Sequence, residues 1–210
     1  MPVLKELIVG DDPAVWDKLG FTMDGDRCRL GHVDVVCNPS VGKGIRGWTL
    51  VGEGPDEVDG IPTSWSVDPL EPNTAPHPNG IVDIDHVVLT TPDTARTVRV
   101  LEGHGIEARR QRETDIYGGP ATQTFFKVGQ PILELIGPNE PMGDQPARFF
   151  GLAFTSEDLD ATAAYLGEAL HPAKDAVQPG RRIATLDKDA GSTIGFAVMS
   201  PDTRQENADV

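Results

Sequence analysis

The stretch NGIVDIDHVVLTTPD, residues 79–93, decides the fold of this chain. Its apolar and β-branched residues predict a buried strand. Thr91 followed by Pro92 predicts the start of a helix, which Gly105 ends. One histidine, His86, stands inside the apolar run, where it is either a metal ligand or a polar residue held in the core. The stretch therefore predicts a strand that passes directly into a helix and carries one candidate functional residue.

The same strand-to-helix order occurs at two other places in the chain. ELIVGDDPAVWDKLGF, residues 6–21, has Asp12 as a predicted N-cap, and GLAFTSEDLDATAAYLGEAL, residues 151–170, has the capping-box spacing of Thr155 and Asp158. Each helix is followed by segments that read as strands separated by turns. These segments are 21–30, 32–37 and 45–52, then 106–113, 121–128 and 131–137, then 172–178, 181–187 and 193–199. The sequence therefore predicts a βαβββ unit three times.

The connections between the units predict how the chain is divided. A long Pro-, Gly- and acid-rich segment, 53–81, separates the first unit from the second, whereas only a short connection joins the second to the third. We therefore expect an N-terminal half-module over 1–52, a linker over 53–81 and a two-unit domain over 82–200. A polar tail, 201–210, follows.

Composition restricts the classes of partner. A hydrophobic content of 38% supports a real core, and the formal net charge of −15, from 33 acidic and 18 basic residues, repels nucleic acid and anionic lipid. Neither a leader peptide nor a membrane span is recognisable. We expect a cytoplasmic protein with a small-molecule ligand and with no nucleic-acid or membrane partner.

Two cysteines lie in the predicted hairpin DRCRLGHVDVVCNP. A two-residue turn at its tip would place Cys28 opposite Val35 and Cys37 opposite Asp26, so the thiols would not be cross-strand partners. The sequence predicts two buried free thiols and no zinc site.

Three segments carry a resemblance to a known family: IDHVVLTTPD, PILELIGP and FFGLAFTSEDLDATAAYL. In their order and spacing they resemble the vicinal oxygen chelate superfamily, which contains glyoxalase I, extradiol dioxygenases, and the bleomycin and fosfomycin resistance proteins. The resemblance covers residues 82–200, and residues 3–52 as a degenerate half-module. It implies an α+β fold in which paired βαβββ modules form a cupped, glyoxalase-like barrel.

The resemblance also implies a divalent metal, such as Zn, Fe, Mn or Ni, in the cup. Its ligands would come from the first and last strands of each module, which here offer His86 and Glu134. Strand alternation places both on one face, and Glu134 is in addition the candidate for proton transfer. Gln123, or a second subunit of a homodimer, would supply a third ligand. In the third unit Gly151 stands opposite His86, and the closing strand TIGFAVMS has no His, Glu, Asp or Gln, so half of the ligand set is missing.

Two further candidates come from VQPGRRIATL, where Arg181 and Arg182 occupy successive strand positions. One should face the cup, suited to a carboxylate or phosphate of a ligand, unless both merely balance surface acids. Three functions remain open: metal-assisted lyase, isomerase or dioxygenase chemistry; metal-free binding or drug sequestration, with Glu134 bonded to His86 alone; and a cup with a structural role only.

Overall fold

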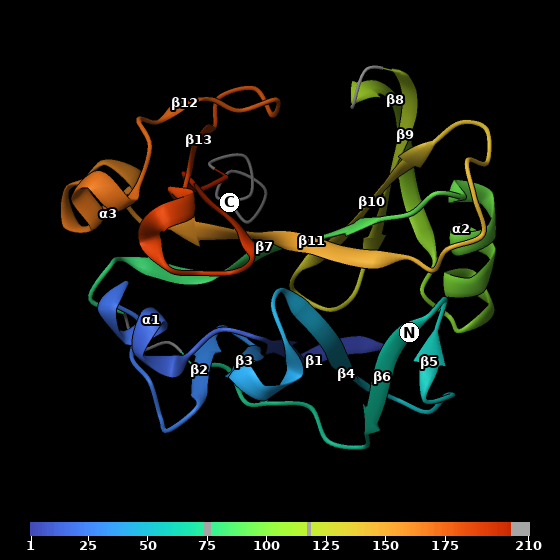
Figure 1. Ribbon diagram of the computed structural model, residues 1–210, viewed down its shortest axis with the longest axis horizontal. Helices are drawn as coiled ribbons and strands as arrows, with labels where there is room; N and C mark the ends of the chain where they lie inside the picture. The colour runs from blue at the N-terminus through green and yellow to red at the C-terminus, as the bar shows by residue number, and fades with distance from the viewer. Residues whose placement is uncertain (74–76, 117–118, 203–210) are drawn as a thin grey trace, which may run out of the picture.

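The computed structural model describes residues 1–73, 77–116 and 119–202, and in them the chain forms two β-sheets with three short α-helices. Figure 1 shows the sheets as two layers: a first, six-stranded sheet from the N-terminal part, and a second, eight-stranded sheet that curves upward at both ends. The predicted α+β class is therefore confirmed. Among the described residues, no helix has the length and apolarity needed to cross a bilayer.

The eight-stranded sheet consists of two βαβββ units placed side by side. Their elements are β7 (Ile81–Thr90), α2 (Thr94–Gly103), β8 (Ala108–Ile116), β9 (Gly119–Lys127) and β10 (Ile132–Pro138), then β11 (Arg148–Ser156), α3 (Leu159–Leu166), β12 (Lys174–Asp175), β13 (Arg182–Thr185) and β14 (Gly195–Met199). The central strands β7 and β11 are antiparallel, and each pairs in parallel with the last strand of its own unit, β10 or β14. The sheet order is β12-β13-β14-β11-β7-β10-β9-β8.

The helix starts differ from the sequence prediction in two of three cases. Asp12 caps α1 (Pro13–Lys18) as predicted, but Asp93 and Asp158, rather than Thr91 and Thr155, cap α2 and α3. The carboxylates of Asp93 and Asp158 accept hydrogen bonds from backbone N–H groups of the first helical turn. A carboxylate suits this position because it also meets the positive end of the helix dipole.

The six-stranded sheet repeats the same plan in shortened form. β1 (Val3–Val9) pairs in parallel with β3 (Val33–Cys37), and β2 (Arg27–Leu30) adds to β3. β4 (Ile45–Val51) lies antiparallel to β1 and pairs in parallel with β6 (Ile61–Ser66), to which β5 (Glu57–Val58) adds. The sheet thus contains two shortened half-modules where the sequence predicted one. Both β5 and β6 lie in the segment 53–81 that was expected to be a linker.

The hairpin of β2 and β3 has the predicted register. Cys28 pairs with Val35, and the backbone N–H of Cys37 donates to the carbonyl of Asp26 at 2.8 Å. Both cysteines are buried and free. The cross-strand prediction for this segment is therefore confirmed.

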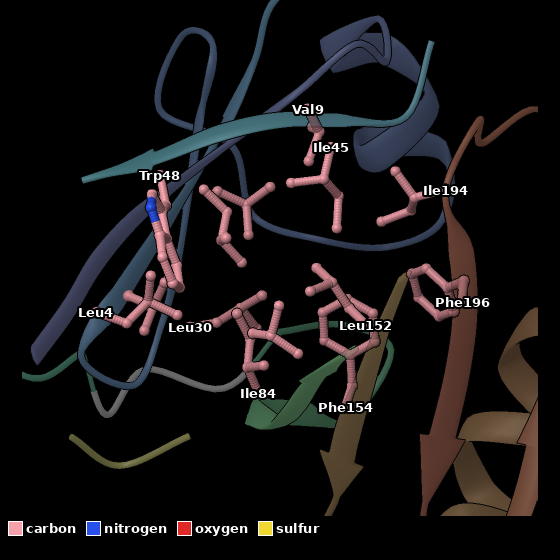
Figure 2. Packing of buried hydrophobic residues seen from close by; sticks show 14 of the residues in the cluster. Leu4, Val9, Leu30, Ile45, Trp48, Ile84, Leu152, Phe154, Ile194 and Phe196 are labelled. Atoms are coloured by element: carbon pink, nitrogen blue, oxygen red, sulfur yellow. The ribbon is translucent and has the colours of Figure 1, made fainter. Parts of the chain in front are cut away.

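The main core lies between the two sheets. Figure 2 shows Leu4, Val9, Leu30, Ile45 and Trp48 of the first sheet facing Ile84, Leu152, Phe154 and Phe196 of the second, with Ile194 just before β14. An aromatic cluster holds its centre, with ring centroids of Phe154 and Phe196 4.4 Å apart and those of Trp16 and Phe21 4.8 Å apart. The first sheet therefore covers the outer face of the second. Burial of each such ring contributes about 2–3 kcal/mol to the stability of the fold.

Two buried carboxylates of the N-terminal part fasten it to the rest of the chain. Asp11 accepts hydrogen bonds from Ser192 Oγ at 2.7 Å and from the backbone N–H of Thr193 at 2.7 Å, just before β14. Asp59, in the β5–β6 turn, pairs with Arg96 Nε on α2 at 3.0 Å. The first sheet is thereby fixed at both ends of the second.

Candidate functional site

The concave face of the eight-stranded sheet encloses a cavity of about 660 Å³. Its walls are β8 and β9 on one side and residues 176–178 with β13 on the other, and its floor includes β7, β10 and β14, as Figure 1 allows the reader to follow. A cavity of this size is typical for a small organic ligand. We call it the cup.

Two neighbouring residues of β7 enter the floor of the cup together. The pairing of β7 with β11 shifts register between Ile84 and His86, and this bulge lets both Asp85 and His86 line the cavity. His86 Nδ1 lies 2.8 Å from Asp85 Oδ1, and His86 Nε2 lies 3.5 Å from Glu134 Oε2 on β10. An ionised carboxylate only accepts, so Nδ1 carries the hydrogen and Nε2 is turned toward Glu134.

Glu134 continues the polar contacts toward the β8–β9 wall. It is 9% exposed and accepts a short hydrogen bond from the side-chain nitrogen of Gln123, which is itself buried. Gln123 Oε1 in turn accepts from Arg112 Nε, which fixes the orientation of the amide. The Arg112 guanidinium also lies 5.4 Å from the ring centroid of Phe125, a cation–π distance.

Arg181 closes the other end of this series. It is 4% exposed, donates from Nε to the carbonyl of Ser200 at 2.8 Å and from Nη1 to Gln178 Oε1 at 2.7 Å, and places Nη2 2.6 Å from Asp85 Oδ2. The Nη2 contact is an ion pair whose angle does not satisfy a hydrogen bond. A continuous polar chain, Arg181–Asp85–His86–Glu134–Gln123–Arg112, therefore crosses the floor of the cup.

Burial and the neighbouring groups set the ionisation of Asp83 and Asp85 on β7, which both line the cup. Burial raises the pKa of Asp83, and the neighbouring charge of Asp85 raises it further. Burial also acts to raise the pKa of Asp85, but contacts with His86 and Arg181 outweigh it, so the pKa is lowered. Asp85 is thus the firmly ionised member, which suits its role of orienting His86.

A divalent metal of the family type meets an incomplete set of ligands here. The 3.5 Å between His86 Nε2 and Glu134 Oε2 suits two ligands of one ion, which would stand about 3.4 Å apart in a tetrahedral site. Gln123 turns its amide nitrogen toward Glu134, so it offers no oxygen there. No group of three His, Cys, Asp or Glu side chains that could hold a metal occurs in residues 1–73, 77–116 and 119–202.

The second βαβββ unit, with β11 and β14, explains why the ligand set is incomplete. Gly151 pairs with Gly195 as His86 pairs with Ile132, and Ala197 holds the place that Glu134 holds in the first unit. A Cβ built on Gly151 would lie 2.2 Å from the carbonyl oxygen of Gly195, so this position has no room for a ligating side chain. The residues present do not fit the complete ligand set that the resemblance implies.

The structure brings together four of the five side chains singled out from the sequence. His86, Glu134, Gln123 and Arg181 all line the cup. Arg182 is exposed and pairs with Asp160 at 2.9 Å, as expected if successive strand residues face opposite sides. What any of these residues does for a ligand remains a prediction.

Sequence reasoning missed Asp85, Arg110, Arg112 and Lys127, which also line the cup. Asp85 was passed over because strict alternation would turn it away from His86. The signal that could have found it is the pair of aspartates in IVDIDH, since acids inside an otherwise apolar strand need buried partners.

Two βαβββ units that pair through their first strands around a cup define a fold of the vicinal oxygen chelate type, as the resemblance implied. No protein-family model matches the chain, and no curated protein matches it either.

Similarity is found among solved structures. A triple mutant of 4-hydroxymandelate synthase from Streptomyces coelicolor matches with a TM-score of 0.60 and 15% identity over 94% of this chain and 91% of that chain. A xylose isomerase-like TIM barrel/4-hydroxyphenylpyruvate dioxygenase fusion protein matches with a TM-score of 0.60 and 15% identity over 95% of this chain and 48% of that chain. Methylmalonyl-CoA epimerase from Mycobacterium tuberculosis matches with a TM-score of 0.48 and 16% identity over 61% of this chain and 93% of that chain. At these identities the similarity shows the fold alone.

Proposed function

We propose that the cup binds a small organic molecule and that Glu134 transfers a proton to or from it. The observation that carries this proposal is the position of Glu134: a nearly buried carboxylate at the centre of the polar chain, on the floor of a cavity of ligand size. The two solved structures with a TM-score of 0.60 carry the names of a synthase and a dioxygenase fusion, which agrees with an enzyme but does not choose the reaction.

Each neighbour of Glu134 has a defined part in this proposal. Gln123 donates to one carboxylate oxygen and so holds the side chain in one rotamer, while the other oxygen faces the cup and His86. A proton leaving a C–H or O–H group of the ligand would pass to that free oxygen. Negative charge then left on the ligand would lie between Arg112 and Arg181, one at each end of the polar chain.

The test is deuterium exchange in D2O, followed by proton NMR, with a panel of small carbonyl compounds that carry an acidic C–H bond. We expect the wild type to exchange at least one of them, and Glu134→Gln to lose about 100-fold or more of the rate. Glu113→Gln is the matched control, because Glu113 is exposed on β8 and does not line the cup. If Glu134→Gln exchanges as fast as the wild type, the role of Glu134 is refuted.

Binding without exchange would favour the second candidate, a metal-free protein that sequesters a drug-like or metabolic ligand. A cup that binds none of the panel and gains no thermal stability from it would contradict both functions. In that case the third alternative, a structural cup, would remain.

Metal-assisted lyase, isomerase or dioxygenase chemistry has two observations in its favour: the 3.5 Å between His86 Nε2 and Glu134 Oε2, and the orientation of His86 by Asp85. A hydrogen bond from the second ring nitrogen to a carboxylate is typical of metal-bound histidine. Elemental analysis of protein purified without a histidine tag tests it: stoichiometric Zn, Fe, Mn or Ni that disappears in His86→Ala would support it. Absence of metal after incubation with each salt would refute it, and the oligomeric state measured alongside would show whether a homodimer forms.

A further inference from the structure

The wall of the cup formed by β8 and β9 is basic in a strongly acidic protein. Of the described residues that line the cup, five are Lys or Arg, although the whole chain carries a net charge of −15. Arg181 belongs to the polar chain of the floor, and Arg112 ends that chain. Of the other three, Arg109 pairs with Glu107 at 3.5 Å. Arg110 and Lys127 are exposed, and neither has a hydrogen bond or an ion pair within the described parts of the chain.

Strand register places Arg110 in line with Glu134. Arg110 on β8 pairs with Phe125 on β9, and Phe125 pairs with Glu134 on β10. All three line the cup. Two strand spacings put the Cα atoms of Arg110 and Glu134 about 10 Å apart, with an aromatic ring between them.

A second row with the same composition runs beside the first. Lys127 on β9 pairs with Ile132 on β10, and Ile132 pairs with His86 on β7. These three also line the cup, and Ile132 keeps 37% of its surface exposed. From the floor outward, each row therefore consists of an acid–base residue, then an apolar residue, then a cation.

The opposite wall differs in chemistry. Val177 and Ile183 contribute apolar side chains there, beside Met199 of the floor, and Val177 is 77% exposed. Exposed apolar groups on one side, and on the other two cations without a partner among the described residues, favour a ligand with an apolar part and an anionic part.

We infer that the ligand is an elongated organic acid whose carboxylate or phosphate binds between Arg110 and Lys127. Its apolar body crosses Phe125 and Ile132, and its far end reaches Glu134 and His86. The inference rests on the proposed function, because it names the class of molecule for the same cup. The acid group is favoured at this wall over the floor, because Arg181 and Arg112 at the floor are already held by Asp85 and Gln123, whereas Arg110 and Lys127 have no such partner among the described residues.

The experiment measures binding by calorimetry with three probes of similar shape: phenylbutanoate, phenylpropyl phosphate and the neutral phenylbutanamide. We expect the wild type to bind one of the acids more tightly than the amide, and the better acid identifies the anionic group. The double variant Arg110→Gln/Lys127→Gln should weaken that acid about tenfold and leave the amide unchanged, because charge-assisted contacts are lost. Thermal unfolding checks that the variant is folded.

The matched control is Lys18→Gln/Arg46→Gln, which removes the same charge from two exposed positions that do not line the cup. Equal affinity for acid and amide in the wild type, or an equal loss of acid affinity in the control, would overturn the inference and leave small-molecule binding intact. If no probe binds, the inference fails, while the deuterium-exchange panel still decides the proposed function separately.

Discussion

Replacing Asp11 by alanine should destabilise the whole protein, because this residue joins the first sheet to the second. Asp11 is 1% exposed, and its carboxylate accepts four hydrogen bonds. These come from Trp16 Nε1, Ser192 Oγ, and the N–H and Oγ1 of Thr193. The three residues span the start of the chain and the loop that leads into β14.

The magnitude follows from the donors that would lose their acceptor. The hydroxyls of Ser192 and Thr193 can rotate toward other partners, whereas the indole N–H of Trp16 and the backbone N–H of Thr193 cannot. An unsatisfied donor costs about 2 kcal/mol when buried and about 1 kcal/mol when partly exposed, so Asp11→Ala should cost about 3 kcal/mol. For a chain of this length that is a fall of about 9 °C in Tm.

The neighbouring carboxylate provides the control. Asp12 is exposed and caps α1 by accepting from the backbone N–H of Ala14 at 2.9 Å. Asp12→Ala should therefore cost only about 1 kcal/mol, or about 3 °C. Urea and thermal unfolding followed by tryptophan fluorescence measure both. If Asp11→Ala loses no more stability than Asp12→Ala, the reasoning that Asp11 fastens the two sheets is refuted.

Three other substitutions test separate features of the fold. Burial lowers the pKa of His77 below its usual 6.5. Its stabilising contribution is therefore full above pH 6.5 and is lost as the pH falls from there through the lower pKa of the folded state, so the urea midpoint should drop as the pH falls below 6.5. His77→Gln should flatten that drop, whereas His171→Gln, a control at an exposed position, should leave it in place. Gly151→Ala should lower the free energy of unfolding by about 3 kcal/mol, because the added Cβ would lie 2.2 Å from the carbonyl oxygen of Gly195. An unchanged free energy would mean that β11 and β14 can move apart at little cost, against the reasoning that there is no room for a side chain. Asp59→Ala should lower the free energy of unfolding by about 3 kcal/mol, because alanine disfavours the φ of 48° and removes the ion pair with Arg96. Asp59→Asn should lower it clearly less, because asparagine tolerates a positive φ. Equal losses would show that backbone conformation is irrelevant there.

The fold of the cup was predictable because its signals are local and repeated. Strand, capped helix and turn-separated strands recur in the second and third units, and the resemblance supplied their pairing. Alternation along β7 and β10 then put His86 and Glu134 on one face, where the structure has them. The alternation of side chains between the two faces of a strand is broken at a β-bulge, however, and a bulge depends on the partner strand. The entry of Asp85 into the cup could therefore not be derived from the sequence of β7 alone.

The pairing of β5 with β6 was missed for a different reason. The segment 53–81 was judged by its average composition, which is rich in Pro, Gly and acids. It nevertheless contains Val58-Asp59-Gly60-Ile61, an Asp-Gly turn between two apolar residues. Asp59 and Gly60 both have positive φ, and Val58 pairs with Ile61. That dipeptide is the strongest short-range signal for a hairpin, and here it outweighs the composition around it.

The two βαβββ units contribute different side chains at equivalent positions of the cup. His86 and Gly151 each stand seven residues before the N-cap of their helix, Asp93 or Asp158, and so occupy equivalent places. On the first side the position carries an imidazole; on the second it has no side chain and no room for one. A cup with equivalent groups on both sides would bind one molecule in two opposite orientations. Because only the β7–β10 side of the floor carries His86 and its acid partner, one orientation of a bound molecule is favoured.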